Sequence, residues 1–346
     1  MKPKLMGPGT MIAQRYEVRG LISSGSFGLV YRVHDHTTGE DVALKRLHAS
    51  AQAVPEQLAR FEREAKLGSR LDHPNIVPHL ASGVLESVHG GGPFLILGLV
   101  RGLPLGDLID TRRRLRVEEA VHILAHVLDA LDAVHRQGAI HRDLKPDNIL
   151  LASPTHSRGD FDMAGSIAAR VGVPEPHDAL WSDLARCDVT LLDFGLGKFL
   201  PVDKRQVTKI TATGMSAGTL HYMSPEQVRA RKDVDYAADL YGAAMLLFRM
   251  LDGAPPYSLC TMVEVAQHHL ASPPPDLPDG SNDQPIGQVY QRAAAKKPRD
   301  RFDSAAQMAW ALRASIDPDL AAKPPPVFEP PPPLRPMGFW SRLFGR

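Results

Sequence analysis

"IHRDLKPDNILL" (residues 140–151), followed by "LLDFGLG" (residues 191–197), is the most informative part of the sequence. Both stretches are specific motifs rather than common turn patterns. Upstream of them lie the glycine-containing "LISSGSFGLVYRV" (residues 21–33) and the lysine of "VALK" (residues 42–45). Chance is a poor explanation for the occurrence of all four motifs in this order in one chain.

The upstream motif has glycines where a loop could hold a phosphate. The spacing of Gly25 and Gly28 lets backbone amides approach phosphate oxygens without a Cβ in the way. Alone this signal is weak, because a strand, a glycine and a strand commonly form only a turn. Ser23 stands where such a loop usually has its first glycine; it costs some flexibility and leaves Gly25 intact.

A charged pair accompanies the glycine loop. The alternating pattern around "VALK" points Lys45 into the cleft beneath the loop. Glu64, in "RFEREA" on a predicted helix, is its natural counter-ion. Most Lys and Glu residues are only solvated charges, so this pair gains its meaning from the acidic motifs downstream.

Composition limits the protein classes. The 346 residues are 43% hydrophobic, enough for one large domain or two lobes, and 40 basic residues nearly balance 39 acidic ones, so no nucleic-acid partner is expected. The only cysteines, Cys187 and Cys260, lack zinc-ligand spacing, which fits a reducing cytosol. No signal peptide or membrane span is predicted.

Periodicity predicts a small sheet followed by a larger helical region. Residues 16–48 alternate as short antiparallel strands, residues 55–71 have helical spacing, residues 94–100 form a further strand, and residues 117–135 form an amphipathic helix. The expected parts are an N-terminal extension (1–15), a sheet lobe with its hinge (16–100), a helical lobe (101–313) with an insertion at about 153–187, and a proline-rich linker with an aromatic and basic tail (314–346).

Over roughly residues 16–313 the chain resembles the protein kinases, and more narrowly the bacterial Hanks-type (eukaryotic-like) Ser/Thr kinases. Supporting motifs are "HPNIV" (73–77), "GTLHYMSPEQ" (218–227), "DLYGAAMLLFRMLDGAPPY" (239–257) and "KPRDRF" (297–302). The resemblance implies an α+β, two-lobed protein kinase fold, with a five-stranded antiparallel N-lobe sheet plus one helix and a mainly helical C-lobe. It implies transfer of the γ-phosphate of Mg-ATP to protein Ser/Thr hydroxyls.

The resemblance assigns the catalytic roles. Asp143 accepts the proton of the substrate hydroxyl, and Lys145 neutralises the transferring phosphoryl group and favours Ser/Thr over Tyr substrates. Asn148 and Asp193 hold Mg²⁺, an ion that prefers oxygen ligands. Asp239 holds the catalytic-loop backbone. Two further residues match structural positions of the family, and the resemblance implies that Glu226 pairs with Arg301.

The nucleotide contacts follow from the same resemblance. Lys45, held by Glu64, orients the α- and β-phosphates, while the Gly98 carbonyl and the Val100 amide meet adenine. The expected nucleotide-binding residues are Ile22, Ser23, Gly25, Gly28, Val30, Ala43, Lys45, Leu97, Gly98, Val100 and Leu150. Of these, Val30, Ala43 and Leu150 sandwich the purine ring.

Regulation is expected in the activation segment, residues 193–226. Arg142 resembles the arginine that pairs with an activation-loop phosphate, and Thr211 and Thr213 are the candidate autophosphorylation sites. The alternative is that these are ordinary loop residues. Thr219 is expected to contact Asp143 and Lys145 rather than to take phosphate.

Two positions depart from the family pattern. Gly68 and His79 stand where kinases usually have apolar residues that stack with His141 and Phe194. Either His79 fills the space vacated at Gly68, or the alignment is off by one and Leu67 or Leu80 takes that place, or the helix carrying Glu64 is loosely seated and needs a partner or phosphorylation to dock. Together with Ser23, these two departures are the only support for the alternative function, an ATP-binding pseudokinase or scaffold that acts through its insertion and tail.

Partners other than protein substrates are less defined. The insertion contains Ile167, Trp181 and Leu184, enough for a short docking helix, or it is disordered. The tail "GFWSRLFGR" (338–346) is an interfacial anchor that binds a bilayer weakly, a peptide that docks on a partner, or an unstructured end. The expected location is cytoplasmic, with peripheral membrane attachment through the tail left open.

Overall fold

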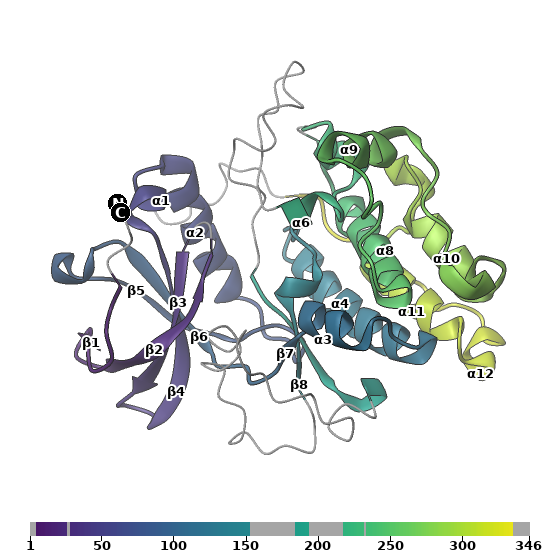
Figure 1. Ribbon diagram of the computed structural model, residues 1–346. Helices are drawn as coiled ribbons and strands as arrows, with labels where there is room; N and C mark the ends of the chain where they lie inside the picture. The colour runs from purple at the N-terminus through teal and green to yellow at the C-terminus, as the bar shows by residue number, and fades with distance from the viewer. Residues whose placement is uncertain (1–4, 26–27, 153–183, 194–216, 232, 335–346) are drawn as a thin grey trace. The chain divides into compact units, whose positions relative to one another are not determined.

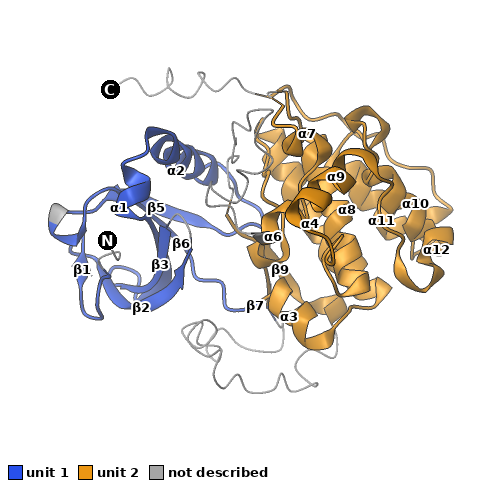
Figure 2. Cartoon of the chain, turned by 45° about the horizontal axis from the view of Figure 1, so that its top comes forward, with its two compact units in different colours: residues 1–103, 152–182 blue, residues 104–151, 183–346 orange. Residues whose placement is uncertain are grey.

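The computed structural model describes residues 5–25, 28–152, 184–193, 217–231 and 233–334. The chain forms two compact units, residues 1–103 with 152–182 and residues 104–151 with 183–346 (Figure 2). Most of the expected insertion, including Ile167 and Trp181, lies outside the described residues. Its described end contains Leu184, which is buried in a short 3-10 helix, η3 (Leu184–Arg186).

Unit 1 is built on an antiparallel sheet with the strand order β1-β2-β3-β4-β6-β5 (Figure 1). Its strands are β1 (Met11–Ile12), β2 (Tyr16–Ser24), β3 (Gly28–Asp35), β4 (Glu40–Leu47), β5 (His79–Val84) and β6 (Pro93–Gly98). The expectation of five strands is one too few. The extra strand, β1, lies within residues 1–15 and pairs with the start of β2. Two residues are too short to show an alternating pattern, so the sequence did not reveal it.

The two faces of this sheet bury different side chains. Along β6, Phe94 and Ile96 point into one core and Leu95 into the other, as alternation along a strand requires. The Leu95 face is covered by α1 (Ala49–Gln52) and α2 (Pro55–Gly68), whose Phe61 is 2% exposed. A further short helix, η1 (Ser87–His89), precedes β6. This packing fixes α2, which carries Glu64, against the strands that carry Lys45 and Leu97.

Gly68, the last residue of α2, packs directly against the His79 side chain of β5. A Cβ built on Gly68 would lie 3.2 Å from His79 Cβ and 3.3 Å from Cδ2. This contact is what the packing explanation of the two departures predicts. Leu80 is 55% exposed and does not fill that space. Burial lowers the pKa of His79, which favours the neutral ring in this apolar position.

A double-mutant cycle tests the contact between Gly68 and His79. In a His79→Ala background, Gly68→Ala is expected to stabilise the protein by about 0.5–1 kcal/mol, because Ala is the better helix former. With His79 present, the same change is expected to be neutral or destabilising, because the methyl group meets the ring. Urea unfolding of the four proteins measures the coupling. An equal effect of Gly68→Ala in both backgrounds would contradict the contact.

Unit 2 is mainly helical (Figure 1). Its helices are α3 (Leu105–Arg112), α4 (Val117–Arg136), α6 (Ala217–Leu220), α7 (Pro225–Val228), α8 (Ala237–Asp252), α9 (Met262–Ala271), α10 (Pro285–Ala293), α11 (Ala305–Ala314) and α12 (Pro318–Ala321), with the 3-10 turns η2 (Pro146–Asn148), η5 (Pro278–Asp283) and η6 (Pro298–Asp300). A small sheet has the order β7-β8-β9, from β7 (Leu103–Pro104), β8 (Ile149–Ala152) and β9 (Asp188–Leu191).

At the centre of unit 2 lies α8, which is buried from Ala238 to Leu251 and packs against α4 and α10. The predicted amphipathic helix at 117–135 corresponds to α4, which also packs against α11. Among the described residues, no helix combines the length and apolar character needed to cross a bilayer.

Candidate active site

In unit 1, Lys45 and Glu64 form an ion pair. Lys45 Nζ on β4 lies 2.7 Å from Glu64 Oε1 on α2, and the two side chains are 16% and 13% exposed. The alternation along β4 brings Lys45 to the face of the sheet that α2 covers, so the strand and the helix bring the charges together. The expected counter-ion contact is therefore present, and the role of the pair toward a nucleotide stays a prediction.

The glycine motif lies at the β2–β3 turn, with residues 26 and 27 outside the described residues. Gly25 donates its amide to the Gly28 carbonyl at 3.0 Å, and His48 Nε2 lies 2.8 Å from the Gly25 carbonyl oxygen. At Gly28 a Cβ would come within 2.3 Å of the Arg46 carbonyl oxygen. Glycine is therefore required at 28 by the close approach of β3 to β4, whether or not the loop binds phosphate.

Strand pairing places the expected adenine contacts of unit 1. Ala43 pairs with Leu97 across β4 and β6, and Val30 pairs with Lys45 across β3 and β4. Ile22 and Ala43 are buried, while Val30, Leu97, Gly98 and Val100 are half-buried. Gly98 packs against Pro78, because a Cβ at 98 would lie 3.1 Å from the proline ring. That packing gives a physical reason for glycine at position 98.

In unit 2, the loop between α4 and β8 is held by Asp239. Asp239 Oδ1 accepts the Arg142 amide at 2.7 Å, and Oδ2 accepts the His141 amide and His135 Nε2, each at 2.8 Å. Burial alone would raise the pKa of Asp239, but the His135 hydrogen bond, the imidazole charges and the Arg142 amide together hold it below its usual value. A fully buried carboxylate therefore fixes two successive amides of this loop.

Asp143 presents an oxygen that no described residue uses. Its backbone carbonyl accepts Asn148 Nδ2 at 2.7 Å, and its Oδ2 lies 3.3 Å from Lys145 Nζ. Its other carboxylate oxygen, Oδ1, is buried and accepts no hydrogen bond within the described part of the chain. A buried acceptor without a donor is costly, so the oxygen is suited to receive a proton or a hydroxyl donor from a ligand.

Asn148 and Asp193 fit a magnesium ion by their donor chemistry. The Asn148 amide nitrogen is committed to the Asp143 carbonyl, which turns the amide oxygen toward other partners. Leu192 donates its amide to the Asn148 carbonyl at 2.8 Å, so Asp193, the next residue, begins beside Asn148. The described residues contain no cluster of three or more His, Cys, Asp or Glu suited to a metal. Two protein oxygens suit Mg²⁺, which usually keeps water or phosphate oxygens as its other ligands.

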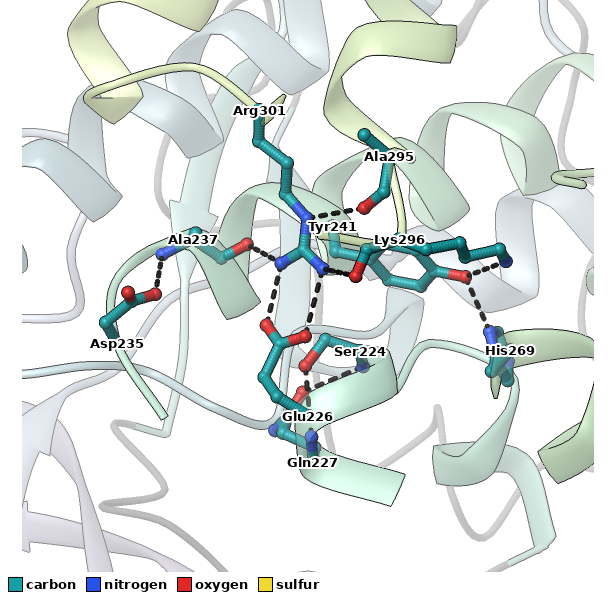
Figure 3. Close-up of polar contacts among 10 residues, drawn as sticks. All are labelled: Ser224, Glu226, Gln227, Asp235, Ala237, Tyr241, His269, Ala295, Lys296 and Arg301. Atoms are coloured by element: carbon teal, nitrogen blue, oxygen red, sulfur yellow. Dashed lines mark hydrogen bonds and ion pairs between the residues drawn. The ribbon is translucent and has the colours of Figure 1, made fainter. Parts of the chain in front are cut away.

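The Glu226–Arg301 pair lies in the core of unit 2 (Figure 3). Arg301 Nη1 and Nη2 donate to the two Glu226 oxygens at 2.7 and 2.9 Å, and the side chains are 0% and 5% exposed. Arg301 also donates to the carbonyls of Ala295, Ala237 and Lys296. One guanidinium thereby joins α7 to the start of α8 and to the segment after α10.

A buried histidine next to this pair is expected to make the stability of unit 2 depend on pH. His269 is 0% exposed, and its Nδ1 lies 2.9 Å from the Tyr241 hydroxyl oxygen (Figure 3). Burial, and then the positive charge of Lys296, lower the pKa of His269 to about 3 from an ordinary 6.5. Above pH 6.5 the ring is neutral in both states. As the pH falls from 6.5 toward 3, His269 becomes protonated in the unfolded chain but stays neutral in the folded chain. The free energy of unfolding therefore decreases over this pH range.

His269→Gln is expected to remove this loss while keeping an acceptor for the Tyr241 hydroxyl. Wild type is expected to lose up to about 1.4 kcal/mol more per pH unit than the variant below pH 6.5. The measurement is the free energy of unfolding in urea at pH 7 and pH 5. Parallel pH dependences for the two proteins would show that His269 does not titrate in this way.

The expected regulatory residues are described in part. Arg142 has a φ of +64°, and its carbonyl accepts Gln227 Nε2 at 2.9 Å, which ties the loop to α7. Thr219 is buried in α6. Thr211 and Thr213 lie outside the described residues, and autophosphorylation there stays a prediction.

Sequence reasoning missed His135, a fully buried partner of the Asp239 carboxylate. Its signal was weak, because a histidine at the end of an amphipathic helix reads as a surface residue. It also missed His48, which contacts the Gly25 carbonyl, and Gln227, which donates to the Arg142 carbonyl. All three act through contacts between residues at least 23 positions apart, which local patterns do not reveal.

Comparison with known proteins agrees with this geometry. A family model described as "Protein kinase domain" matches residues 16–277. The serine/threonine-protein kinase pkn3 of Myxococcus xanthus is 32% identical over 310 residues, 88% of this chain and 51% of that protein. The serine/threonine-protein kinase PknB of Mycobacterium leprae is 30% identical over 301 residues, covering 86% and 42% of the two chains. This chain thus spans about half the length of the curated relatives it matches.

A solved structure shows the same fold. The crystal structure of the Mycobacterium tuberculosis PknI kinase domain is 25% identical, covers 90% of this chain and 100% of its own, and has a TM-score of 0.61. The predicted two-lobed fold and the predicted resemblance to bacterial Ser/Thr kinases are confirmed. From the match of the family model, together with the buried loop support and the Lys45–Glu64 pair, the chain belongs to the protein kinase domain family.

Proposed function

We propose that this chain is a serine/threonine protein kinase that transfers the γ-phosphate of Mg-ATP to hydroxyl groups of protein substrates. The observation that carries the proposal is the buried Asp143 Oδ1, which accepts no hydrogen bond from the described residues. It belongs to a loop whose backbone is fixed by Asp239, with Lys145 Nζ 3.3 Å from the second carboxylate oxygen.

In this proposal, Asp143 accepts the proton of the substrate hydroxyl as its oxygen attacks the γ-phosphorus, while the bond from that phosphorus to the β–γ bridging oxygen breaks and ADP leaves. Lys145 reduces the negative charge on the transferred group, since phosphoryl transfer depends mainly on positioning and electrostatics. Asn148 and Asp193 would hold Mg²⁺, which would supply positive charge next to the phosphate oxygens.

Unit 1 contributes the nucleotide contacts of the proposal. Lys45 binds the α- and β-phosphates, and its ion pair with Glu64 fixes the direction of its ammonium group. Backbone groups of Gly98 and Val100 meet adenine, so the adenine contact needs no side chain at position 98. Backbone amides around Gly25 approach the phosphates, and Ser23 does not prevent this, because the contact is made by the main chain.

Regulation by phosphate on Thr211 or Thr213, with Arg142 as the partner, belongs to the same proposal. The charge and geometry of an arginine favour paired contacts with phosphate oxygens. The cytoplasmic location and the three interpretations of the tail remain predictions.

Intact-mass analysis after incubation with Mg-ATP tests the function without a known substrate. Steps of one phosphate, absent from a phosphatase-treated control, are expected. Peptide mapping then tests Thr211 and Thr213. Measurable ATP binding in a thermal-shift assay, without transfer to the chain itself or to a general protein substrate, would favour the pseudokinase or scaffold.

A further inference from the structure

Within unit 2, the proline-rich segment at residues 324–334 contacts Tyr236, the residue just before α8. It has neither helix nor strand, and its described residues make no backbone hydrogen bonds to one another. The Tyr236 hydroxyl donates to the Pro332 carbonyl oxygen at 2.5 Å. Phe328, Pro331 and Leu334 are half-buried, whereas the other residues of the segment are exposed.

The spacing of the half-buried residues is the spacing expected of a polyproline II helix. Phe328, Pro331 and Leu334 recur every third residue. A polyproline II helix has three residues per turn, so these side chains lie along one edge of it. Its backbone carbonyls have no internal partners, which leaves Pro332 available to accept the Tyr236 hydroxyl. Burial with a period of three is the pattern expected when one edge of such a helix meets a surface.

The surface below the segment is aromatic and basic. The Tyr236 ring, just before α8, lies against the His135 ring with 4.7 Å between centroids. Arg136, at the end of α4, bonds to Asp132, and this bond, followed more weakly by the negative charge of Glu329, raises the pKa of Arg136. Aromatic grooves with hydrogen-bond donors are the usual receptors of polyproline II ligands. We call Tyr236 and Arg136 the Tyr236 surface.

We propose that the Tyr236 surface is a docking site for a polyproline II segment and that residues 328–334 of the same chain occupy it. The occupant follows from connectivity, because α12 ends at Ala321 on unit 2 and only residues 322–327 separate it from the docked stretch. A tether this short gives an effective concentration on the order of millimolar, which favours the chain's own segment over a free competitor. Neither Tyr236 nor Arg136 belongs to the proposed catalytic residues, so docking is measured independently of phosphoryl transfer.

Two matched variants of the full chain separate the docked edge from the exposed positions. The docked-edge variant is Phe328→Ala/Pro331→Ala/Leu334→Ala, and the exposed control is Val327→Ala/Pro330→Ala/Pro333→Ala. Both have three alanines in the same segment, which follows the last described helix α12, so neither is expected to unfold the helices of unit 2.

The probe is a fluorescein-labelled peptide of residues 324–334, whose binding is measured by fluorescence anisotropy. It is expected to bind the docked-edge variant at least about tenfold more tightly than wild type or the exposed control, where the chain's own segment competes. Adding Tyr236→Phe to the docked-edge variant is expected to weaken the peptide about threefold to tenfold, the effect of one hydrogen bond.

Equal affinity for wild type and the docked-edge variant, or no binding to that variant at millimolar peptide, would overturn the proposal. Light scattering, which measures the oligomeric state, tests whether the tail of a second copy of the chain occupies the site instead. A wild-type dimer that becomes a monomer in the docked-edge variant would assign the site to the tail of a second copy and would overturn docking within one chain.

Discussion

Asp143→Asn is expected to lower the rate of phosphoryl transfer by about 10³-fold while leaving the affinity for ATP within about threefold of wild type. The amide has nearly the same shape as the carboxylate, but it cannot accept the hydroxyl proton of a substrate. The contacts that position the loop do not depend on the charge of Asp143, because Asp239 holds the amides of His141 and Arg142. The change should therefore remove chemistry and preserve structure.

Asp147→Asn is the matched control for this substitution. Asp147 lies four residues further on in the same loop, and its side chain is exposed. Incorporation of phosphate from Mg-ATP, by intact mass and by transfer to a general protein substrate, should fall only for Asp143→Asn. Unfolding temperatures of the three proteins should agree. Retention of more than about a tenth of the wild-type rate by Asp143→Asn would remove Asp143 as the general base.

The sequence predicted those parts of the site that lie within continuous motifs. Asp143, Lys145 and Asn148 are separated by at most five residues, so one loop brings them together and the motif alone implies the arrangement. The pair Lys45–Glu64 was also accessible, because strand alternation and helix spacing each point one side chain in a predictable direction.

Contacts that depend on tertiary packing were not predictable in the same way. The His135–Asp239 bond joins residues 104 positions apart, and nothing near His135 distinguishes it from a surface histidine. Strand β1 has two residues and gains its identity only by pairing with β2. The sequence also could not show which residues of 328–334 are half-buried. In a proline-rich run, composition alone gives no reason to expect one position to be more buried than another.

The second large effect is on stability. Arg301→Met is expected to lower the free energy of unfolding by about 3–5 kcal/mol, because it leaves the buried Glu226 carboxylate without its positive partner. Arg301 is fully buried and makes a two-pronged contact with Glu226, which is 5% exposed, so solvent cannot replace the lost charge. The carbonyls of Ala237 and Ala295 also lose their donor, which adds to the cost.

Arg299→Met is the control, since Arg299 lies two residues away with a side chain that is 79% exposed and should change stability by less than about 0.5 kcal/mol. The double variant Arg301→Met/Glu226→Leu distinguishes an unpaired charge from lost packing. If the unpaired carboxylate causes most of the loss, the double variant recovers more than about 1 kcal/mol relative to Arg301→Met, although the orphaned carbonyls prevent full recovery. The measurement is the free energy of unfolding in urea, at constant m-value, for wild type, the two single variants and the double variant. A loss below about 1 kcal/mol for Arg301→Met would mean that unit 2 relaxes around Glu226 and lets water reach it.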